Sequence, residues 1–403
     1  MKFSEIIGQR EVKQHLVEMI QHNRLSHALL FLGKEGSGAL QLAFALAQYL
    51  TCEKANPKRQ ISNSNASLFS EETEGTGLKS PTINDSCGIC ASCLKSQQLI
   101  HPDIHYSYPV VTKKSGSPPL SIDYISEWRE FTKNYPYGNV YDWLQYIGAE
   151  NKQGNITAQE CNDIIKQLNL KSFESEYKIL VLWMPEYLGN EGNKLLKAIE
   201  EPPPNTLFIL VAENEPLILP TIASRCQLIK ISALETNEIE EGLITRYNIN
   251  VETARQAASI SEGNFREALQ MVQHTEEDWQ SLLRDWLNTV LKTGPVAQTK
   301  WVEEISRLGR EKQKQFLRYF NHLLEQAIRH KLMGDNISLP ENEKDFADRL
   351  NRVAGIAQHE AIIEELDKAT YYIERNANAK ILFHALTIKL YHIIQDKIVF
   401  LTN

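Results

Sequence analysis

A short apolar run, a glycine-rich turn and a helix follow one another near the N-terminus, and this succession constrains the fold more than any other feature. A strand is expected over residues 28–32 and a helix over residues 40–50, where alanine and leucine dominate. The turn between them, residues 33–38, has the sequence Gly-Lys-Glu-Gly-Ser-Gly. A continuous apolar run of this length is typical of a strand buried inside a parallel sheet. Strand, glycine turn and helix are together the entry to a nucleotide-binding α/β fold.

The turn keeps the glycines of a phosphate-binding loop but lacks the residues that act on phosphate. A working loop has the pattern G-x-x-x-x-G-K-[ST], in which the lysine neutralises the β- and γ-phosphates and the hydroxyl holds Mg²⁺. Gly33, Gly36 and Gly38 are present. Ala39 stands in place of the lysine, and Leu40 in place of the hydroxyl. The pattern indicates a degenerate nucleotide loop, although a glycine turn that never bound nucleotide would have the same sequence.

Strand and helix patterns alternate again over residues 156–231. Strands are expected over 178–183 and 206–212, and a helix over 157–170 precedes them. Alternation of this kind predicts a parallel sheet. Trp183-Met184 stands at the strand end where a Walker-type ATPase places two acidic residues, so that no carboxylate is available there to organise a metal-bound nucleotide.

The 403 residues are enough for two or three domains at roughly 100–200 residues each. We expect an α/β domain over residues 1–231. Within it we expect a cysteine-containing module at about 52–103 and an insertion at about 105–155, which is rich in tyrosine, proline and serine. Nearly everything after this domain has a helical pattern, which we divide into a small helical domain, 232–276, and a larger helical domain, 277–403.

Three cysteines within seven residues indicate a metal site. Cys87, Cys90 and Cys93 have C-x-x-C spacing, which lets their thiols reach one ion from a tight turn. Cys52, at the end of the preceding helix, is the best candidate for the fourth ligand of a tetrahedral zinc site, and His101 is the alternative. A closed four-cysteine site leaves no position for water, so the zinc would be structural. Free thiols or a redox-active C-x-x-C pair are the other interpretations.

Charge and hydropathy exclude several classes of protein. Asp and Glu number 51 against 43 Lys and Arg, a net charge of −8, whereas proteins that grip the phosphate backbone usually have a basic excess. Six cysteines are too few for a disulfide scaffold. No apolar run approaches the roughly 20 residues of a membrane span, and the N-terminus lacks the apolar core of a signal peptide. We expect a cytoplasmic protein of several domains with no membrane attachment.

Two further features indicate packing and not chemistry. Glu200 and Glu201 end a helix before three prolines, and adjacent residues on a helix do not share a face, so they are not a catalytic carboxylate pair. The aromatic stretch over residues 135–143 could stack on bases, but Lys133 is the only basic residue nearby. We expect these aromatic side chains to pack within the insertion.

With these motifs in order, the chain resembles the clamp-loader family of bacterial DNA polymerase III, which belongs to the AAA+ class. The resemblance implies an AAA+ P-loop-type α/β domain with an inserted zinc module, a small helical lid domain and an all-α C-terminal collar for assembly. It covers most of residues 3–275 and, more weakly, the last thirty. The segments that support it are, in chain order, Gly8-Gln9, 27–31, the four cysteines with His101-Pro102-Asp103, 193–197, 200–203, Ser224-Arg225-Cys226, 263–269 and 376–380.

The resemblance also implies roles for individual residues. Ser224 and Arg225 stand at the family's arginine-finger motif, so Arg225 would enter the ATP site of a neighbouring subunit and stabilise charge on the transferred phosphoryl group. Without the family context, Arg225 would be interpreted as a surface arginine with a salt-bridge partner. Arg266 stands at the sensor-2 position. Because a phosphate-binding lysine is absent at Ala39, we expect Arg266 to bond locally at the start of its helix.

We therefore expect a non-catalytic stator subunit, with structural Zn²⁺ as its own cofactor and ATP bound only in the neighbouring subunit. Its partners would be the clamp-loader ATPase subunits (gamma/tau) and the delta subunit and, through the complex, the sliding clamp and primer-template DNA. One alternative is an ATP-hydrolysing subunit of the gamma/tau type, which predicts a lysine at 39, a hydroxyl at 40 and acidic residues at 183 and 184. Another is a zinc-containing nucleic-acid-binding protein, which predicts basic residues around the cysteines, where only Lys79 and Lys95 are close.

Overall fold

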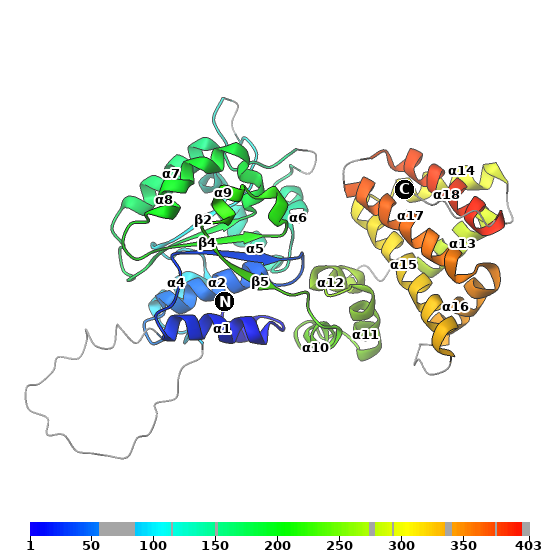
Figure 1. Cartoon of the computed structure of the whole chain (residues 1–403), viewed down its shortest axis with the longest axis horizontal. Helices are drawn as coiled ribbons and strands as arrows, with labels where there is room; N and C mark the ends of the chain where they lie inside the picture. Colours follow the sequence, from blue (N-terminus) through cyan, green and yellow to red (C-terminus); the bar gives the residue numbers. More distant parts are fainter. Residues whose placement is uncertain are drawn as a thin grey trace, which may run out of the picture. The chain divides into compact units, whose positions relative to one another are not determined.

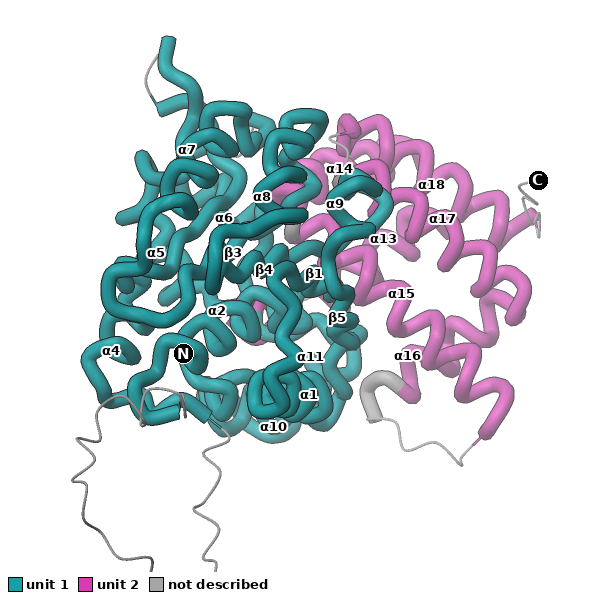
Figure 2. The backbone as a smooth tube through the Cα atoms, turned by 60° about the vertical axis from the view of Figure 1, so that its left-hand side comes forward, with its two compact units in different colours: residues 1–269 teal, residues 270–403 magenta. Residues whose placement is uncertain are grey.

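The computed structural model describes most of the chain, and the chain divides into two compact units, residues 1–269 and 270–403 (Figure 2). Most of the segment between Cys52 and Cys87, and Asn376 of the proposed collar motif, lie outside the described residues. The described ranges are 1–55, 85–113, 116–149, 152–273, 279–291, 294–334, 341–374 and 377–396.

Unit 1 is built on a five-stranded sheet with the strand order β2-β3-β4-β1-β5. Every pairing in it is parallel, which confirms the predicted parallel sheet. β1 lies between β4 and β5, so it is an inner strand of the sheet. The glycine turn therefore follows the carboxyl end of an inner strand and not of an edge strand. The strands are β1 (Ala28–Gly33), β2 (Ile104–Ser107), β3 (Lys178–Trp183), β4 (Thr206–Ala212) and β5 (Gln227–Ile231).

Helices cover both faces of the sheet, as Figure 1 shows for α1 and α2 on one side and α7, α8 and α9 on the other. Alternate strand residues enter two separate cores: Leu29 and Phe31 pack with α1 and α2, whereas Ala28 and Leu30 pack with α7 and α8. This explains the continuous apolar runs, because both faces are buried. The helices are α1 (Arg10–Gln21), α2 (Ala39–Thr51), α4 (Ala91–Gln97), α5 (Ile125–Asn134), α6 (Val140–Tyr146), α7 (Ala158–Asn169), α8 (Leu196–Glu200) and α9 (Pro220–Ala223).

The segment expected to be an insertion at about 105–155 differs from that expectation, because it begins inside the sheet. Ile104 pairs with Ile179, so β2 is an edge strand of the core sheet. Trp128 and Trp143, from α5 and α6, are buried in the same core as Trp183 of β3. The strand has only four residues, two of them half-buried, and so short a segment leaves no period to recognise.

Short 3₁₀ helices and three further α-helices complete unit 1. The 3₁₀ helices are η1 (Phe3–Glu5), η2 (Ser121–Tyr124), η3 (Pro185–Leu195) and η4 (Glu215–Leu217). After β5 the chain forms α10 (Thr236–Tyr247), α11 (Val251–Ile260) and α12 (Phe265–Gln273), and α12 runs into unit 2. Residues 232–269 thus belong to the same compact unit as the sheet, and their separation as a lid domain stays a proposal.

All the regular secondary structure in the described residues of unit 2 is helical. Its core centres on Trp286 and Trp301, whose rings stack with their centroids 4.7 Å apart. Asn378 caps the last helix by accepting a hydrogen bond from the Ile381 backbone at 3.3 Å. Among the described residues of the whole chain, no helix is both long and apolar enough to cross a bilayer. The helices are α13 (Trp279–Leu291), α14 (Pro295–Ser306), α15 (Arg310–Met333), α16 (Glu341–Val353), α17 (Ile356–Glu374) and α18 (Ala379–Gln395).

Candidate functional site

The glycine-rich turn lies between β1 and α2 and is closed by side chains from elsewhere in unit 1. Gly36 and Gly38 have φ values of +73° and +88°, a conformation that glycine adopts without strain. Asn264 lies against the turn so closely that a Cβ on Gly36 would meet its Oδ1 at 1.9 Å. Phe265 donates its backbone N–H to the Gly36 carbonyl at 3.3 Å. The start of α12 therefore lies directly on the turn.

Little space remains in front of the turn. The cavity there measures about 30 Å³ and is bounded by the turn itself and by Tyr137, Trp183 and Glu213. Such a volume holds a water molecule, whereas small-molecule sites measure roughly 300 Å³ or more. The rings of Tyr137 and Phe265 pack with their centroids 4.8 Å apart, and the Tyr137 hydroxyl accepts a hydrogen bond from the Ile7 backbone at 3.1 Å. Burial raises the pKa of this tyrosine to about 12, so that it stays protonated.

Arg266 is the charged centre of this closed arrangement. Its side chain is 3% exposed, and its Nε and Nη2 donate to the two oxygens of Asp142 at 2.5 and 2.6 Å. Its Nη1 donates to Glu35 Oε1 at 2.8 Å. Asn139 and Asn264 donate to the same Glu35 carboxylate at 3.0 and 3.3 Å. All three guanidinium nitrogens therefore donate to carboxylates, with which arginine forms strong charge-assisted hydrogen bonds.

The expectation that Arg266 bonds locally is wrong. Asp142 lies 124 residues away in the sequence and Glu35 lies 231 residues away. The fold brings the first turn of α6 and the glycine turn against the start of α12. The spacing of Asn139 and Asp142 indicates the start of a helix, because the two side chains form a capping box, but nothing in it identifies the distant arginine.

Replacing Arg266 with alanine should lower the free energy of unfolding of unit 1 by about 3 kcal/mol, because two largely buried carboxylates would lose their counter-charge. Urea denaturation followed by circular dichroism measures the change. The matched control is Arg255→Ala on α11, whose pair with Glu240 spans 3.5 Å and whose side chain is 70% exposed. That control should change stability by less than about 0.5 kcal/mol. Equal unfolding midpoints for the two variants would contradict a structural role for the network.

Arg225 lies on the surface of unit 1, after α9, with its side chain 37% exposed. Its Nε donates to Oε1 of Glu200, the last residue of α8. Its Nη1 donates to the Thr221 carbonyl at 2.8 Å and to Ser224 Oγ at 3.3 Å. Ser224 and Arg225 thus bond to each other, and the pair with Glu200 is the surface salt bridge expected of Arg225 without the family context. The sequence indicated Glu200 only as a helix end.

The four cysteines form a compact cluster. Their four Sγ atoms lie within 4.8 Å of one another, and they come from the end of α2 and from the turn and first residues of α4. Backbone N–H groups of Cys87, Cys90 and Cys93 each donate to a cysteine sulfur at 3.4 Å. A hydrogen bond from Cys93 lowers the pKa of Cys52, because the donated proton stabilises the thiolate. The same hydrogen bond raises the pKa of Cys93, and burial raises the pKa of Cys90, so that negative charge is favoured on the sulfur of Cys52.

The donor set suits a tetrahedral zinc ion. Zinc–sulfur bonds of about 2.3 Å place the sulfurs of such a site about 3.8 Å apart, and Cys87 Sγ lies 3.9 Å from Cys93 Sγ. Four sulfur ligands are typical of structural zinc. His101, the alternative ligand, instead contacts Ser92 Oγ at 3.0 Å and Glu174 Oε1 at 3.3 Å. Among the described residues, the cysteine cluster is therefore compatible with structural zinc through Cys52 and not through His101.

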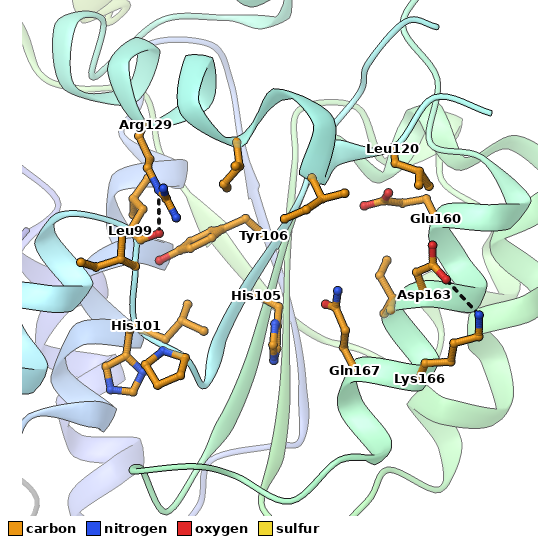
Figure 3. A pocket seen from close by; sticks show the side chains of 16 residues that line it. Leu99, His101, His105, Tyr106, Leu120, Arg129, Glu160, Asp163, Lys166 and Gln167 are labelled. Carbon is orange, nitrogen blue, oxygen red and sulfur yellow. Dashed lines mark hydrogen bonds and ion pairs between the residues drawn. The ribbon is translucent and has the colours of Figure 1, made fainter. Parts of the chain in front are cut away.

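A larger hollow of about 320 Å³ runs along β2, and Figure 3 shows Arg129 on one side of it and Asp163 with Lys166 on the other. Arg129 donates to the Leu99 carbonyl at 3.2 Å, and Lys166 donates to Asp163 at 3.1 Å. Burial lowers the pKa of His105, in the same lining, to about 4, so that it is neutral near pH 7. The lining mixes charges of both signs, and of the candidate site residues that the sequence indicated it contains only His101, the alternative zinc ligand.

Comparison with known proteins identifies the family of the chain. A family model described as DNA polymerase III, delta subunit, matches residues 8–76 and 76–235, more than half of the chain. The chain belongs to this family. The match covers the sheet and the segments from the glycine turn to the arginine motif, and it confirms the resemblance to polymerase III subunits that the sequence indicated.

Individual relatives agree with the family model. The chain is 25% identical over 269 residues to DNA polymerase III subunit delta' of Bacillus subtilis (strain 168), which is 66% of this chain but 60% of that protein. It is 23% identical over 397 residues to subunit delta' of Escherichia coli (strain K12), 96% of this chain and 95% of that protein. A solved gamma subunit-related protein of Thermotoga maritima is 14% identical with a TM-score of 0.36, covering 94% of this chain and 98% of that one. The assignment rests on the family model and the curated relatives.

Proposed function

We propose that the chain is a non-catalytic stator subunit of the delta' type in a DNA polymerase III clamp loader. It would join the ATPase subunits and the delta subunit in the cytoplasm, and the complex would load a sliding clamp onto primed DNA. Arg225 would complete the ATP site of a neighbouring subunit, and Zn²⁺ would hold the cysteine cluster together. The relatives named delta', one of which aligns over 95% of its own length, support this choice.

One observation supports the non-catalytic role more than any other. The glycine turn has Ala39 in place of the lysine, and Glu35 of the same turn is bonded to Arg266, which also pairs with Asp142. A triphosphate that paired with Arg266 would have to displace Asp142 and would meet the Glu35 carboxylate. Both effects oppose nucleotide binding. Displacement would leave the Asp142 carboxylate without its counter-charge, and the Glu35 carboxylate would repel the negative phosphates.

The ATP-hydrolysing subunit remains the rival to test, because a relative named DNA polymerase III subunit tau from Escherichia coli (strain K12) is 26% identical over 67% of this chain. That alignment covers 32% of the tau protein, whereas the alignment to the delta' protein of the same organism covers 95%. The nucleic-acid-binding alternative has less support. Lys95, one of the basic residues near the cysteines, pairs with Glu174 at 2.6 Å.

Reconstitution tests the proposal directly. We expect the purified chain to co-elute with gamma/tau-type ATPase subunits and the delta subunit in gel filtration. ATP turnover stimulated by clamp and primed DNA should then require the chain. The chain alone should neither bind ATP with Mg²⁺ in titration calorimetry at millimolar nucleotide nor hydrolyse it. Hydrolysis by the isolated chain would favour the motor alternative, and failure to co-elute would contradict a clamp-loader role.

A further inference from the structure

We infer that Glu200 is a positioning residue for Arg225, whose carboxylate orients the guanidinium for a phosphate in the neighbouring subunit. The inference rests on the proposed function, because it concerns how the arginine finger is held before and during assembly. Nothing in the sequence motifs assigns such a role to Glu200, which ends a helix before three prolines.

The guanidinium is held at two of its three nitrogens. Nε is bonded to Glu200, and Nη1 is bonded to the Thr221 carbonyl and to Ser224 Oγ. Within the described part of the chain, no group bonds Nη2. The planar guanidinium offers five donors in a fixed fork. Holding Nε and Nη1 therefore sets the plane of the fork and leaves the two hydrogens of Nη2 for a phosphate oxygen.

The groups that hold the arginine lie on a packed framework. Ile199, the residue before Glu200, is buried at 1% exposure, and Ile222 in α9 is fully buried. The Glu201 backbone donates to the Lys197 carbonyl at 3.0 Å, and the three prolines that follow restrict the chain. The backbones of Glu200 and Thr221 are thus fixed, so that the arginine is oriented before a partner arrives. Preorganisation of this kind lowers the cost of placing a long side chain in a site.

The opposite role for Glu200 would change ATP turnover in the opposite direction, so the direction of the change tests the inference. If Glu200 mainly held Arg225 away from the neighbour, its removal would free the arginine and raise turnover. If Glu200 positions the fork, its removal would leave a flexible arginine and lower turnover. The pair is partly exposed, at 37% and 45%, so its loss should reduce the rate by about fivefold and not abolish it.

The experiment compares variants in the fully reconstituted clamp loader, with kcat and KM for ATP measured in the presence of clamp and primed DNA. The quantity compared is the part of the turnover that is lost in Arg225→Ala. Glu200→Ala should lower this part about fivefold through kcat, with KM for ATP changed by less than about twofold. Glu200→Gln keeps an acceptor for Nε at the same place and should recover much of the loss. Glu201→Ala, the neighbouring exposed carboxylate, is the matched control and should match the wild type.

Several outcomes would overturn the inference. Turnover in Glu200→Ala that equals or exceeds that of the wild type would do so, as would equal loss in Glu201→Ala. A Glu200→Ala, Arg225→Ala double variant slower than Arg225→Ala alone would show that Glu200 acts independently of the arginine. If Arg225→Ala itself leaves turnover unchanged in an intact complex, the finger assignment fails and the positioning role fails with it. Should Glu200→Ala fail to assemble, the comparison of Glu200→Gln with Glu201→Gln decides.

Discussion

Alanine at Arg225 should leave the clamp loader assembled and slow hydrolysis at the ATP site that this chain completes by about 10³-fold or more. The physical reason is the loss of a fixed positive charge at the point where negative charge develops on the transferred phosphoryl group. Other ATP sites in the complex would still turn over. The steady-state rate of ATP hydrolysis by the whole complex should therefore fall only by the fraction that this one site contributes.

Rapid-quench measurement of a single turnover in the reconstituted complex separates that site from the others. Arg225→Lys is the informative second variant, because lysine keeps the charge but loses the planar fork, and it should recover only part of the rate. Arg255→Ala serves as the control, since Arg255 is also a surface arginine paired with a glutamate. An assembled complex with unaltered single-turnover kinetics in Arg225→Ala would disprove the finger assignment.

Serine at Cys93 should abolish zinc binding and unfold the region around α4. Cys93 is fully buried, and its sulfur lies 3.9 Å from that of Cys87. Structural zinc sites in small peptides contribute on the order of 10 kcal/mol at pH 7, and a closed site cannot replace a missing thiolate from the protein. We therefore expect about one zinc per wild-type chain and none in the variant. Increased proteolysis should be confined to the region between the end of α2 and β2.

Elemental analysis of the purified chain measures the zinc content, and limited proteolysis locates the change. Cys226→Ser is the matched control, because burial raises the pKa of Cys226 to about 11 and this thiol lies outside the cluster. The control should keep its zinc and its protease resistance. Native wild-type protein that contains no metal, with all four cluster thiols free to react with a thiol reagent, would refute the zinc proposal.

The parallel sheet could be predicted from the sequence because buried strands leave a strong local signal. β1, β3 and β4 are continuous apolar runs, and each is covered on both faces. The edge strand β2 could not be predicted in the same way. It is four residues long and alternates poorly, and only its pairing with β3 identifies it as a strand. Its neighbours Trp128 and Trp143 share a core with Trp183, and no local pattern in the sequence indicates contacts between residues so far apart.

The cysteine cluster could also be predicted from spacing alone, because three of its members are neighbours in the sequence. The fourth depended on the fold. The sequence allows either Cys52 or His101 as the fourth ligand. In the structure Cys52 lies with the other three cysteines, whereas His101 contacts Ser92 and Glu174.

By itself, the sequence determined the features that depend on residues close together: the strand, glycine turn and helix, the missing lysine at Ala39, the cysteine spacing and the position of Arg225. Only the tertiary structure decided which carboxylate faces which arginine. Asp142 reaches Arg266 from 124 residues away, and Glu200 reaches Arg225 from 25 residues away. An aspartate or glutamate has the same local pattern whether or not an arginine faces it. The packing of helices around the sheet creates these pairs, and the hydrophobic periodicity of the sequence does not indicate them.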